Sequence, residues 1–261
     1  MTVYVGIGGW VFPEWRDNFY PKGLPQKREL EYASRHLTAI EVNGTYYGSQ
    51  KPESFARWHD ETPEDFVFTL KGPRFATNRR VLAEAGDSIS RFVDSGITRL
   101  KTKLGPINWQ FMATKKFDAE DFEAFLALLP KSADGIALRH AVEVRHDGFA
   151  VPGFVALCRK YGIAIIASCD SEFPCIADVT ADFVYVRAMG TSENEKTGYP
   201  KAAIARWAAR AKIWEVGGTP DDLKLVGHAA PKTKRDVFLF VISGAKARNP
   251  AAAQALIAAL A

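Results

Sequence analysis

Eight polar or charged side chains lie in, or directly after, the short hydrophobic runs of this sequence. Three are acidic and three are basic: Glu41, Asn43, Lys71, Gln110, Glu143, Arg145, Asp170 and Arg187. A buried charge costs several kcal/mol unless it is paired, so packing alone does not explain such a concentration. The pattern favours a functional cluster, and a structural network of ion pairs is the alternative interpretation of the same residues.

Carboxylates beside amines and guanidinium groups predict acid–base chemistry without a metal ion. Neighbouring charges drive the pKa values of two carboxyls apart, which gives one acid and one base. Glu143 is the first acid–base candidate because Arg145 lies two residues further along the same strand face. Lys71 could serve as a cation, a proton shuttle or a Schiff-base nucleophile. We therefore predict catalytic roles for four residues: Glu143, Glu41, Asp170 and Lys71.

The same positions carry side chains suited to holding a substrate. Aromatic rings follow the first two hydrophobic runs and could stack on a sugar or a base. Planar guanidinium groups bind carboxylate or phosphate through paired hydrogen bonds. The predicted substrate-binding residues are Asn43, Tyr46, Tyr47, Gln110, Arg145, Arg187 and Trp10. We expect a small anionic ligand, or one resembling a sugar or nucleotide, and no cofactor.

The histidines do not predict a metal centre. A metal-dependent barrel enzyme needs several His and Asp or Glu ligands that converge on one point. Of the five histidines, only His146 follows a predicted strand, so we predict no metal ligands. A Mg²⁺ ion bound by Glu41, Glu143 and Asp170 is the alternative that the residue types leave open.

These side chains can converge only if the hydrophobic runs are parallel strands. Eight Val/Ile/Phe-rich runs are expected to be strands: 3–7, 39–43, 66–71, 106–111, 141–145, 163–170, 183–187 and 237–242. Helical patterns lie between them, at 27–36, 52–59, 88–103, 118–129, 152–161 and 201–214 and after Asn249. This alternation predicts an α/β fold, a single (β/α)₈ TIM barrel domain over 1–261, whose active site lies at the carboxyl ends of the strands. A doubly wound sheet is the alternative, but the first turn, GIGGWVFPEW, lacks the third glycine of a nucleotide-binding loop.

Five segments of the sequence resemble one family. They are GGWVFPEWRDNFYPKGL, IEVNGTYYGSQKPESFARWHDETPEDFVFTLKGP, LGPINWQF, VEVRH and FVYVRAMG, and they are similar to the YecE-like family, domain of unknown function 72. The resemblance implies a TIM barrel related to those of endonuclease IV and xylose isomerase. It implies no specific reaction, because the activity of the family is not established.

The chain departs from the family pattern at several positions. Met189 stands where the Y-x-R-x-H-G motif has its histidine, and Asn78 stands where a Thr-His pair has its histidine. Ile242 and Ser243 replace the two asparagines of an F-N-N-D-like run at the last strand. The resemblance therefore implies either a divergent enzyme or a ligand-binding barrel that has lost catalysis.

Composition excludes several other classes of protein. The chain has 261 residues, 47% hydrophobic and 25% charged, with a formal net charge of +4, which by itself predicts no nucleic-acid or membrane partner. Its apolar runs are far shorter than the roughly 20 residues of a membrane span. The three cysteines, Cys158, Cys169 and Cys175, form no C-x-x-C pair, and the first residues lack a basic signal region. We expect a cytoplasmic protein without a disulfide framework or a cysteine-rich zinc site.

Two features point to partners and motion at the barrel mouth. Residues 71–103 contain eight Lys or Arg against three Asp or Glu, so nucleic-acid binding is an alternative function. The basic residues expected at the mouth are Arg74, Arg79 and Arg80. The polar segment 188–200 is predicted to be a lid that hinges at Gly190 and Gly198.

Overall fold

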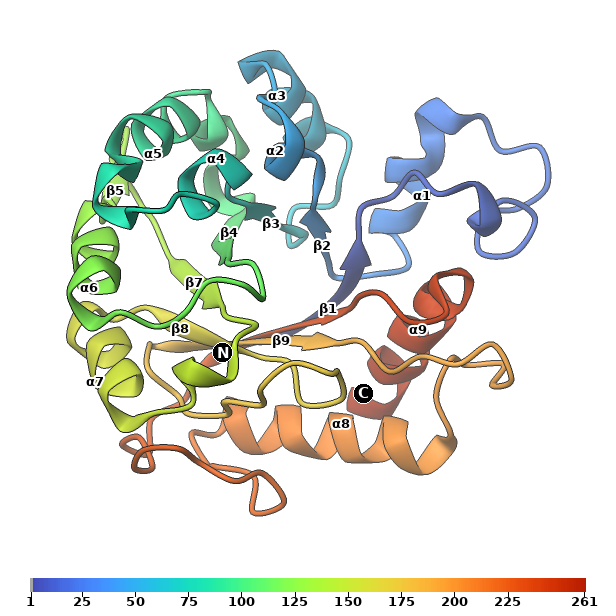
Figure 1. Ribbon diagram of the computed structural model, residues 1–261. Helices are drawn as coiled ribbons and strands as arrows, with labels where there is room; N and C mark the ends of the chain where they lie inside the picture. Colours follow the sequence, from blue (N-terminus) through green and yellow to red (C-terminus); the bar gives the residue numbers. More distant parts are fainter. Residues whose placement is uncertain (1) are drawn as a thin grey trace.

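The computed structural model describes residues 2–261, which form a closed barrel of parallel strands with helices around it (Figure 1). Hydrogen-bonded neighbours follow the order β1-β10-β9-β8-β7-β4-β3-β2, and β2 closes the barrel against β1. The strands are β1 Val3–Gly8, β2 Ala39–Val42, β3 Val67–Lys71, β4 Leu104–Gln110, β7 His140–Glu143, β8 Ala164–Ala167, β9 Phe183–Ala188 and β10 Asp236–Val241. The predicted TIM barrel is confirmed, and each strand overlaps one of the eight predicted runs.

Helices cover the outer face of the barrel (Figure 1). The α-helices are α1 Glu29–Ser34, α2 Gly44–Tyr47, α3 Pro52–Asp60, α4 Arg74–Thr77, α5 Gly86–Val93, α6 Ala119–Leu128, α7 Pro152–Tyr161, α8 Lys201–Glu215 and α9 Asn249–Leu260. Short 3₁₀ helices are η1 Pro13–Trp15, η2 Gln26–Arg28, η3 Leu82–Ala85, η4 Ile97–Lys103, η5 Asp147–Phe149 and η6 Lys246–Arg248. Among the described helices, none is long and apolar enough to cross a membrane.

Local sequence signals explain several helix ends. The Asp118 side chain accepts a hydrogen bond of 3.0 Å from the backbone N–H of Asp121 and so caps α6. Gly162 ends α7 in the left-handed conformation. The predicted helix 88–103 is divided into α5 and η4 by Gly96, whose φ of 97° is left-handed. A Cβ there would lie 2.7 Å from Pro52, so this close turn requires glycine.

Two connections differ from a simple alternation of strands and helices. A short antiparallel hairpin, β5 Ser132–Ala133 with β6 Ile136–Ala137, precedes β7. The connection 168–182 between β8 and β9, all of it described, is formed by turns and contains no helix. Both segments place backbone near the strand ends without adding to the outer helical layer.

The alternation of side chains along each strand separates two hydrophobic layers. One cluster fills the barrel interior and contains Ala39, Val67, Ala141, Ala164, Ile166, Phe183, Tyr185, Phe238, Phe240 and Ile242. The intervening residues, such as Ile40, Leu70 and Val142, belong to the larger cluster beneath the helices. Since side chains two residues apart share a strand face, Glu41, Lys71, Glu143 and Arg187 lie on the interior side of the strands.

The cysteines form one bond that the sequence did not predict. Cys169 and Cys175 form a disulfide, with their Cα atoms 4.5 Å apart, and Cys158 is free and buried in α7. The two cysteines meet because the turn after β8 folds back on itself. A spacing of six residues carries no motif that would have revealed this approach.

Candidate functional site

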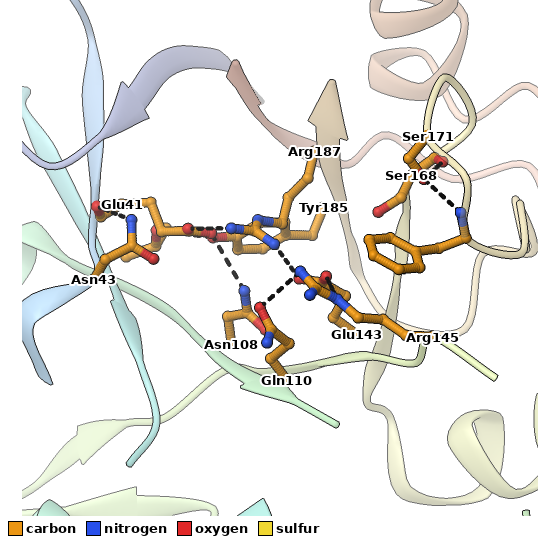
Figure 2. A network of polar contacts seen from close by, with 12 residues as sticks. Glu41, Asn43, Asn108, Gln110, Glu143, Arg145, Ser168, Ser171, Tyr185 and Arg187 are labelled. Atoms are coloured by element: carbon orange, nitrogen blue, oxygen red, sulfur yellow. Dashed lines mark hydrogen bonds and ion pairs between the residues drawn. The ribbon is translucent and has the colours of Figure 1, made fainter. Parts of the chain in front are cut away.

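A buried arginine joins two buried glutamates inside the carboxyl end of the barrel (Figure 2). Arg187, at the end of β9, donates from Nη2 to Glu41 Oε1 at 3.0 Å and from Nη1 to Glu143 Oε2. Glu41 comes from β2 and Glu143 from β7, on either side of the interior. The network brings together three of the residues that the sequence predicts as site residues.

Neutral and charged side chains complete the hydrogen bonding of both carboxylates. Tyr185 donates to Glu41 Oε2 at 2.6 Å, and Asn108 donates to the same oxygen at 3.3 Å. On the other side, Arg145 donates to Glu143 Oε1 at 2.8 Å and to Gln110 Oε1 at 3.0 Å (Figure 2). Tyr185 lies two residues before Arg187 and Asn108 lies two residues before Gln110, so each shares a strand face with a predicted site residue. Their position on that face was the signal that could have identified them.

The guanidinium groups determine the charge of Glu143. Burial alone would raise the pKa of this carboxyl, but Arg187, followed by Arg145 and Lys71, holds it below the ordinary value. The carboxylate is therefore ionised at neutral pH. An ionised, guanidinium-bound carboxylate balances charge and positions its partners, and it is a poor proton donor.

A cavity of about 790 Å³ opens above this network. Eight of the predicted site residues line it: Trp10, Asn43, Tyr46, Tyr47, Lys71, Gln110, Arg145 and Arg187. The cavity is also lined by residues without a predicted role, and these include Gly8, Gly9, Gln50, Lys246 and Asn249. Glu41 and Glu143 are buried and bonded to Arg187, which itself borders the cavity. The volume lies within the range of small-molecule sites in proteins.

Lys71 is the unusual cation of this cavity. Its side chain leaves the end of β3 and is 7% exposed, and its Nζ lies 4.4 Å from the centre of the Tyr46 ring. Among residues 2–261, the Lys71 ammonium has no hydrogen-bond acceptor and no carboxylate within 4.0 Å. Burial, together with the nearby Arg187, lowers the pKa of Lys71 to about 8. The amine is thus partly neutral near physiological pH.

The aromatic residues that line the cavity differ in how far they are exposed. Trp10 packs edge-to-face on Trp58 and so belongs both to the core and to the cavity wall. Tyr46 is buried beneath Lys71, whereas Tyr47 is 66% exposed. Tyr47 is therefore free to stack on a ligand or partner, while Tyr46 shapes the surroundings of the amine.

Asp170 does not join the two glutamates. Its carboxylate accepts hydrogen bonds from the backbone N–H groups of Met189, at 2.8 Å, and Gly190, at 3.1 Å, and from the Tyr199 hydroxyl. These bonds hold the start of the segment 188–200. Among the described residues that line the cavity, none comes from this segment, so the segment does not cover the cavity in this conformation, and its motion as a lid stays a prediction.

The disulfide loop supports Arg145 instead. Phe173, between the two bonded cysteines, places its ring 4.3 Å from the Arg145 guanidinium. Its backbone N–H donates to Ser171 Oγ, and Ser171 donates to the Ser168 carbonyl at 2.7 Å (Figure 2). The Phe173 ring of this loop therefore packs against the Arg145 guanidinium, which borders the cavity.

The donor set does not suit a bound metal ion. Within residues 2–261, no three His, Cys, Asp or Glu side chains converge as metal ligands. Arg187 occupies the position between Glu41 and Glu143, and Asp170 is bonded elsewhere. The structure therefore gives no support to a Mg²⁺ ion held by these three carboxylates.

The sequence matches the family model described as "Protein of unknown function DUF72" over residues 4–261. The chain belongs to the DUF72 family. UPF0759 protein YecE of Escherichia coli K12 is 30% identical over 154 residues, which are 58% of this chain and 51% of YecE. UPF0759 protein YunF of Bacillus subtilis is 30% identical over 69 residues, or 26% of this chain and 23% of YunF. The matched region thus spans about half the length of YecE and less of YunF.

Solved structures of the DUF72 family have the same fold. A Thermotoga maritima member superposes with a TM-score of 0.73 at 23% identity, covering 98% of this chain and 97% of its own. An Enterococcus faecalis member gives a TM-score of 0.73 at 16% identity, covering 99% and 95%. SacUVDE is more distant, with a TM-score of 0.56 at 11% identity and coverage of 99% and 97%. These similarities show the barrel fold and leave the reaction of this DUF72 protein to be argued from its site.

Two of the departures from the DUF72 pattern lie at the cavity itself. Ile242 and Ser243 border the cavity after β10. Met189 is buried, and its backbone N–H is bonded to Asp170, while Asn78 follows α4 and is exposed. This DUF72 chain therefore has an apolar group and a hydroxyl at the positions where the resemblance implies amides.

Proposed function

We propose that this DUF72 protein is an enzyme that binds a small carboxylate or phosphate compound at the barrel mouth and acts on it through the Lys71 amine. The observation that carries the proposal is the placement of Lys71. Its side chain is largely buried, its amine opens onto the cavity and forms no hydrogen bond or ion pair within residues 2–261, and burial with Arg187 lowers its pKa to about 8. Lysines activated by burial or by a cationic neighbour serve enzymes as bases or nucleophiles.

The balance of charge around the cavity supports an anionic ligand. The two carboxylates, Glu41 and Glu143, are already bonded to guanidinium groups. The cavity wall also carries Lys71 and Lys246, and the Lys246 ammonium lies 4.3 Å from the Phe12 ring centre. The cations at the wall therefore outnumber the carboxylates, and an anion would neutralise the excess.

The Lys71 amine and the Glu143 carboxylate have different roles in the proposed reaction. At pH 7 roughly one Lys71 amine in ten is neutral, from a pKa of about 8, and can accept a proton or attack a carbon atom. Glu143 stays ionised beneath it and stabilises the ammonium that forms when the amine takes up a proton. This proposal moves the acid–base role from Glu143 to Lys71.

Calorimetric titration with phosphate, citrate and pyruvate tests the binding step. We expect saturable binding that weakens at least about tenfold in Lys71→Met and in Arg145→Met, because each loses a charged contact with the ligand. Lys232→Met is the matched control, since Lys232 is an exposed lysine that precedes β10 and does not border the cavity. Equal affinity in all three variants would refute an anion site at the barrel mouth.

Nucleic-acid binding is the second candidate, favoured by exposed rings beside basic residues. Phe75, in α4, is 60% exposed beneath the Arg74 guanidinium, which lies 5.4 Å from the ring centre. Arg80 is also exposed, but Arg79 is bonded to the Phe75 carbonyl and to Ser88. Fluorescence anisotropy with a single-stranded oligonucleotide at low and high salt tests this function. Salt-dependent binding that is lost in Arg74→Ala would support it, and the absence of binding at low salt would refute it.

A further inference from the structure

We propose that Lys71 forms an imine with an aldehyde or ketone that also carries a carboxylate or phosphate group. The inference rests on the proposed anion site and adds the reacting group of the ligand, a carbonyl carbon. It also assigns Lys71 a covalent role rather than proton transfer alone.

A second buried lysine of the same chain shows how a structural lysine is held. Lys103, 2% exposed, donates from Nζ to the carbonyl oxygens of His59 and Thr62 and to the Thr62 hydroxyl, the last at 3.3 Å. These contacts satisfy all three donors of an ammonium group. Lys71 is buried nearly as deeply, but within residues 2–261 its amine has no such acceptors. Acceptors like those of Lys103 would stabilise a lysine whose role is purely structural. The Lys71 amine lacks such acceptors within residues 2–261 and faces the cavity, which points to a reaction partner.

The surroundings fix the position of Lys71 without binding its amine. The Thr45 hydroxyl, in α2, donates to the Lys71 backbone carbonyl at 2.7 Å, and the next residue, Tyr46, places its ring against the amine. The side chain is thus held between β3 and α2 and borders the cavity. A nucleophile held in this way loses little freedom when it attacks a bound carbonyl carbon.

Neighbouring cations favour the neutral form of the amine. Burial contributes most to the lowered pKa of Lys71, and Arg187 adds to it, while Glu41 and Glu143 act in the opposite direction. The two carboxylates are engaged by guanidinium groups and form no direct ion pair with Lys71. Only the neutral amine carries the lone pair needed for attack.

The reaction balances without a further reactant. The Nζ lone pair forms a bond to the carbonyl carbon while the carbon–oxygen π electrons move to oxygen; the nitrogen then gives up one proton and the oxygen takes up one, which gives a carbinolamine. Loss of water then breaks the remaining carbon–oxygen bond and leaves a carbon–nitrogen double bond. The acidic group of the same molecule would lie toward Arg145 and Lys246, which border the cavity.

Reductive trapping tests the proposal. The full-length protein is incubated at pH 7 with cyanoborohydride and one of three aldehydes: glyoxylate, glycolaldehyde phosphate or neutral glycolaldehyde. The reductant delivers hydride to the imine carbon and leaves a stable secondary amine, which peptide mass spectrometry locates. We expect saturable modification of Lys71 by the two charged aldehydes, at least about tenfold faster than that of the exposed Lys232, because about one Lys71 amine in ten is neutral at pH 7.

Two matched variants separate the role of Lys71 from that of an ordinary surface lysine. Lys71→Arg keeps the positive charge and should abolish the trapped adduct while anions still bind. Lys232→Arg, at an exposed lysine that does not border the cavity, should leave trapping at Lys71 intact.

The outcomes distinguish failure of the covalent step from failure of the anion site. Adducts spread over exposed lysines, with no preference for Lys71, would overturn the imine while calorimetric anion binding could still stand. Equal trapping at Lys71 by neutral glycolaldehyde, together with no anion binding, would support the nucleophile but overturn the acidic ligand and the proposed anion site.

Discussion

Replacement of Lys71 by methionine should stabilise the protein, and the gain should depend on pH. Lys71 is charged in the unfolded chain below its ordinary pKa of 10.5, and folding lowers that value to about 8. The folded state therefore disfavours the ammonium form. Methionine has a similar length and is apolar, so it removes this penalty without leaving a large void.

The size of the effect follows from the shift in pKa. One pKa unit corresponds to about 1.4 kcal/mol, so a change from 10.5 to about 8 amounts to about 3 kcal/mol in the free energy of unfolding. Loss of the contact between the ammonium and the Tyr46 ring offsets about 1 kcal/mol. We expect Lys71→Met to be more stable than the wild type by about 2 kcal/mol at pH 7.

The pH dependence has a definite sign. Below pH 8 the lysine is protonated in both states and the full penalty is present. Between pH 8 and pH 10.5 the unfolded chain binds more protons than the folded one, so the stability of the wild type rises relative to the variant. Urea unfolding at several pH values measures this difference, with Lys246→Met as the control. A variant that is less stable than the wild type at pH 7, or a gain that does not shrink above pH 8, would refute the reasoning.

Three further perturbations follow from the contacts of the site. Glu143→Gln leaves the buried Arg187 guanidinium without one of its two carboxylates and should lower the free energy of unfolding, measured in urea, by about 3–5 kcal/mol. Because the pKa of Glu143 is lowered in the folded state, this loss should shrink as the pH falls below the ordinary glutamate value. An unchanged unfolding curve at pH 7 would contradict the prediction. Asp170→Asn should speed amide hydrogen exchange at Met189 and Gly190 while anion affinity in calorimetry stays unchanged, and a large loss of affinity would instead place Asp170 in the binding site. Phe173→Ala removes the ring beneath Arg145 and should weaken anion binding about threefold to tenfold. Phe75→Ala is the control, because the Phe75 ring is exposed and lies outside this cavity. Equal affinities of the two variants would show that the disulfide loop does not support Arg145.

The barrel could be predicted because its signals are local and periodic. Short β-rich runs alternate with capped helices, and Glu41, Glu143 and Arg187 each lie within one of those runs. The carboxyl ends of parallel strands converge in a barrel, so the sequence order of those residues was sufficient to group them.

The failures share a different cause, since they depend on turns rather than strands. Asp170 lies at the strand end that the pattern indicated, but the turn after β8 directs its carboxylate to the backbone of the segment after β9. The same turn brings Cys169 to Cys175. Strand periodicity contains no information on how a connecting turn folds, so neither contact could be predicted.

The chemical roles could be predicted only in part, because they depend on which side chains form ion pairs and hydrogen bonds with one another. Glu143 and Lys71 were both identified as titratable groups of one interior. Only the structure shows that two guanidinium groups bind Glu143 while the Lys71 amine is left open. That difference is the reason why the proposed function assigns the reaction to the amine.

The most direct measurement of the central claim is the pKa of Lys71 itself. Carbon-13 NMR of protein labelled at the lysine Cε positions follows deprotonation of each amine, and Lys71→Arg identifies the Lys71 signal by its disappearance. We predict a titration with its midpoint near pH 8 for Lys71. A midpoint near the ordinary value of 10.5 would mean that the amine is protonated and inert at neutral pH, and it would contradict both the proposed function and the imine.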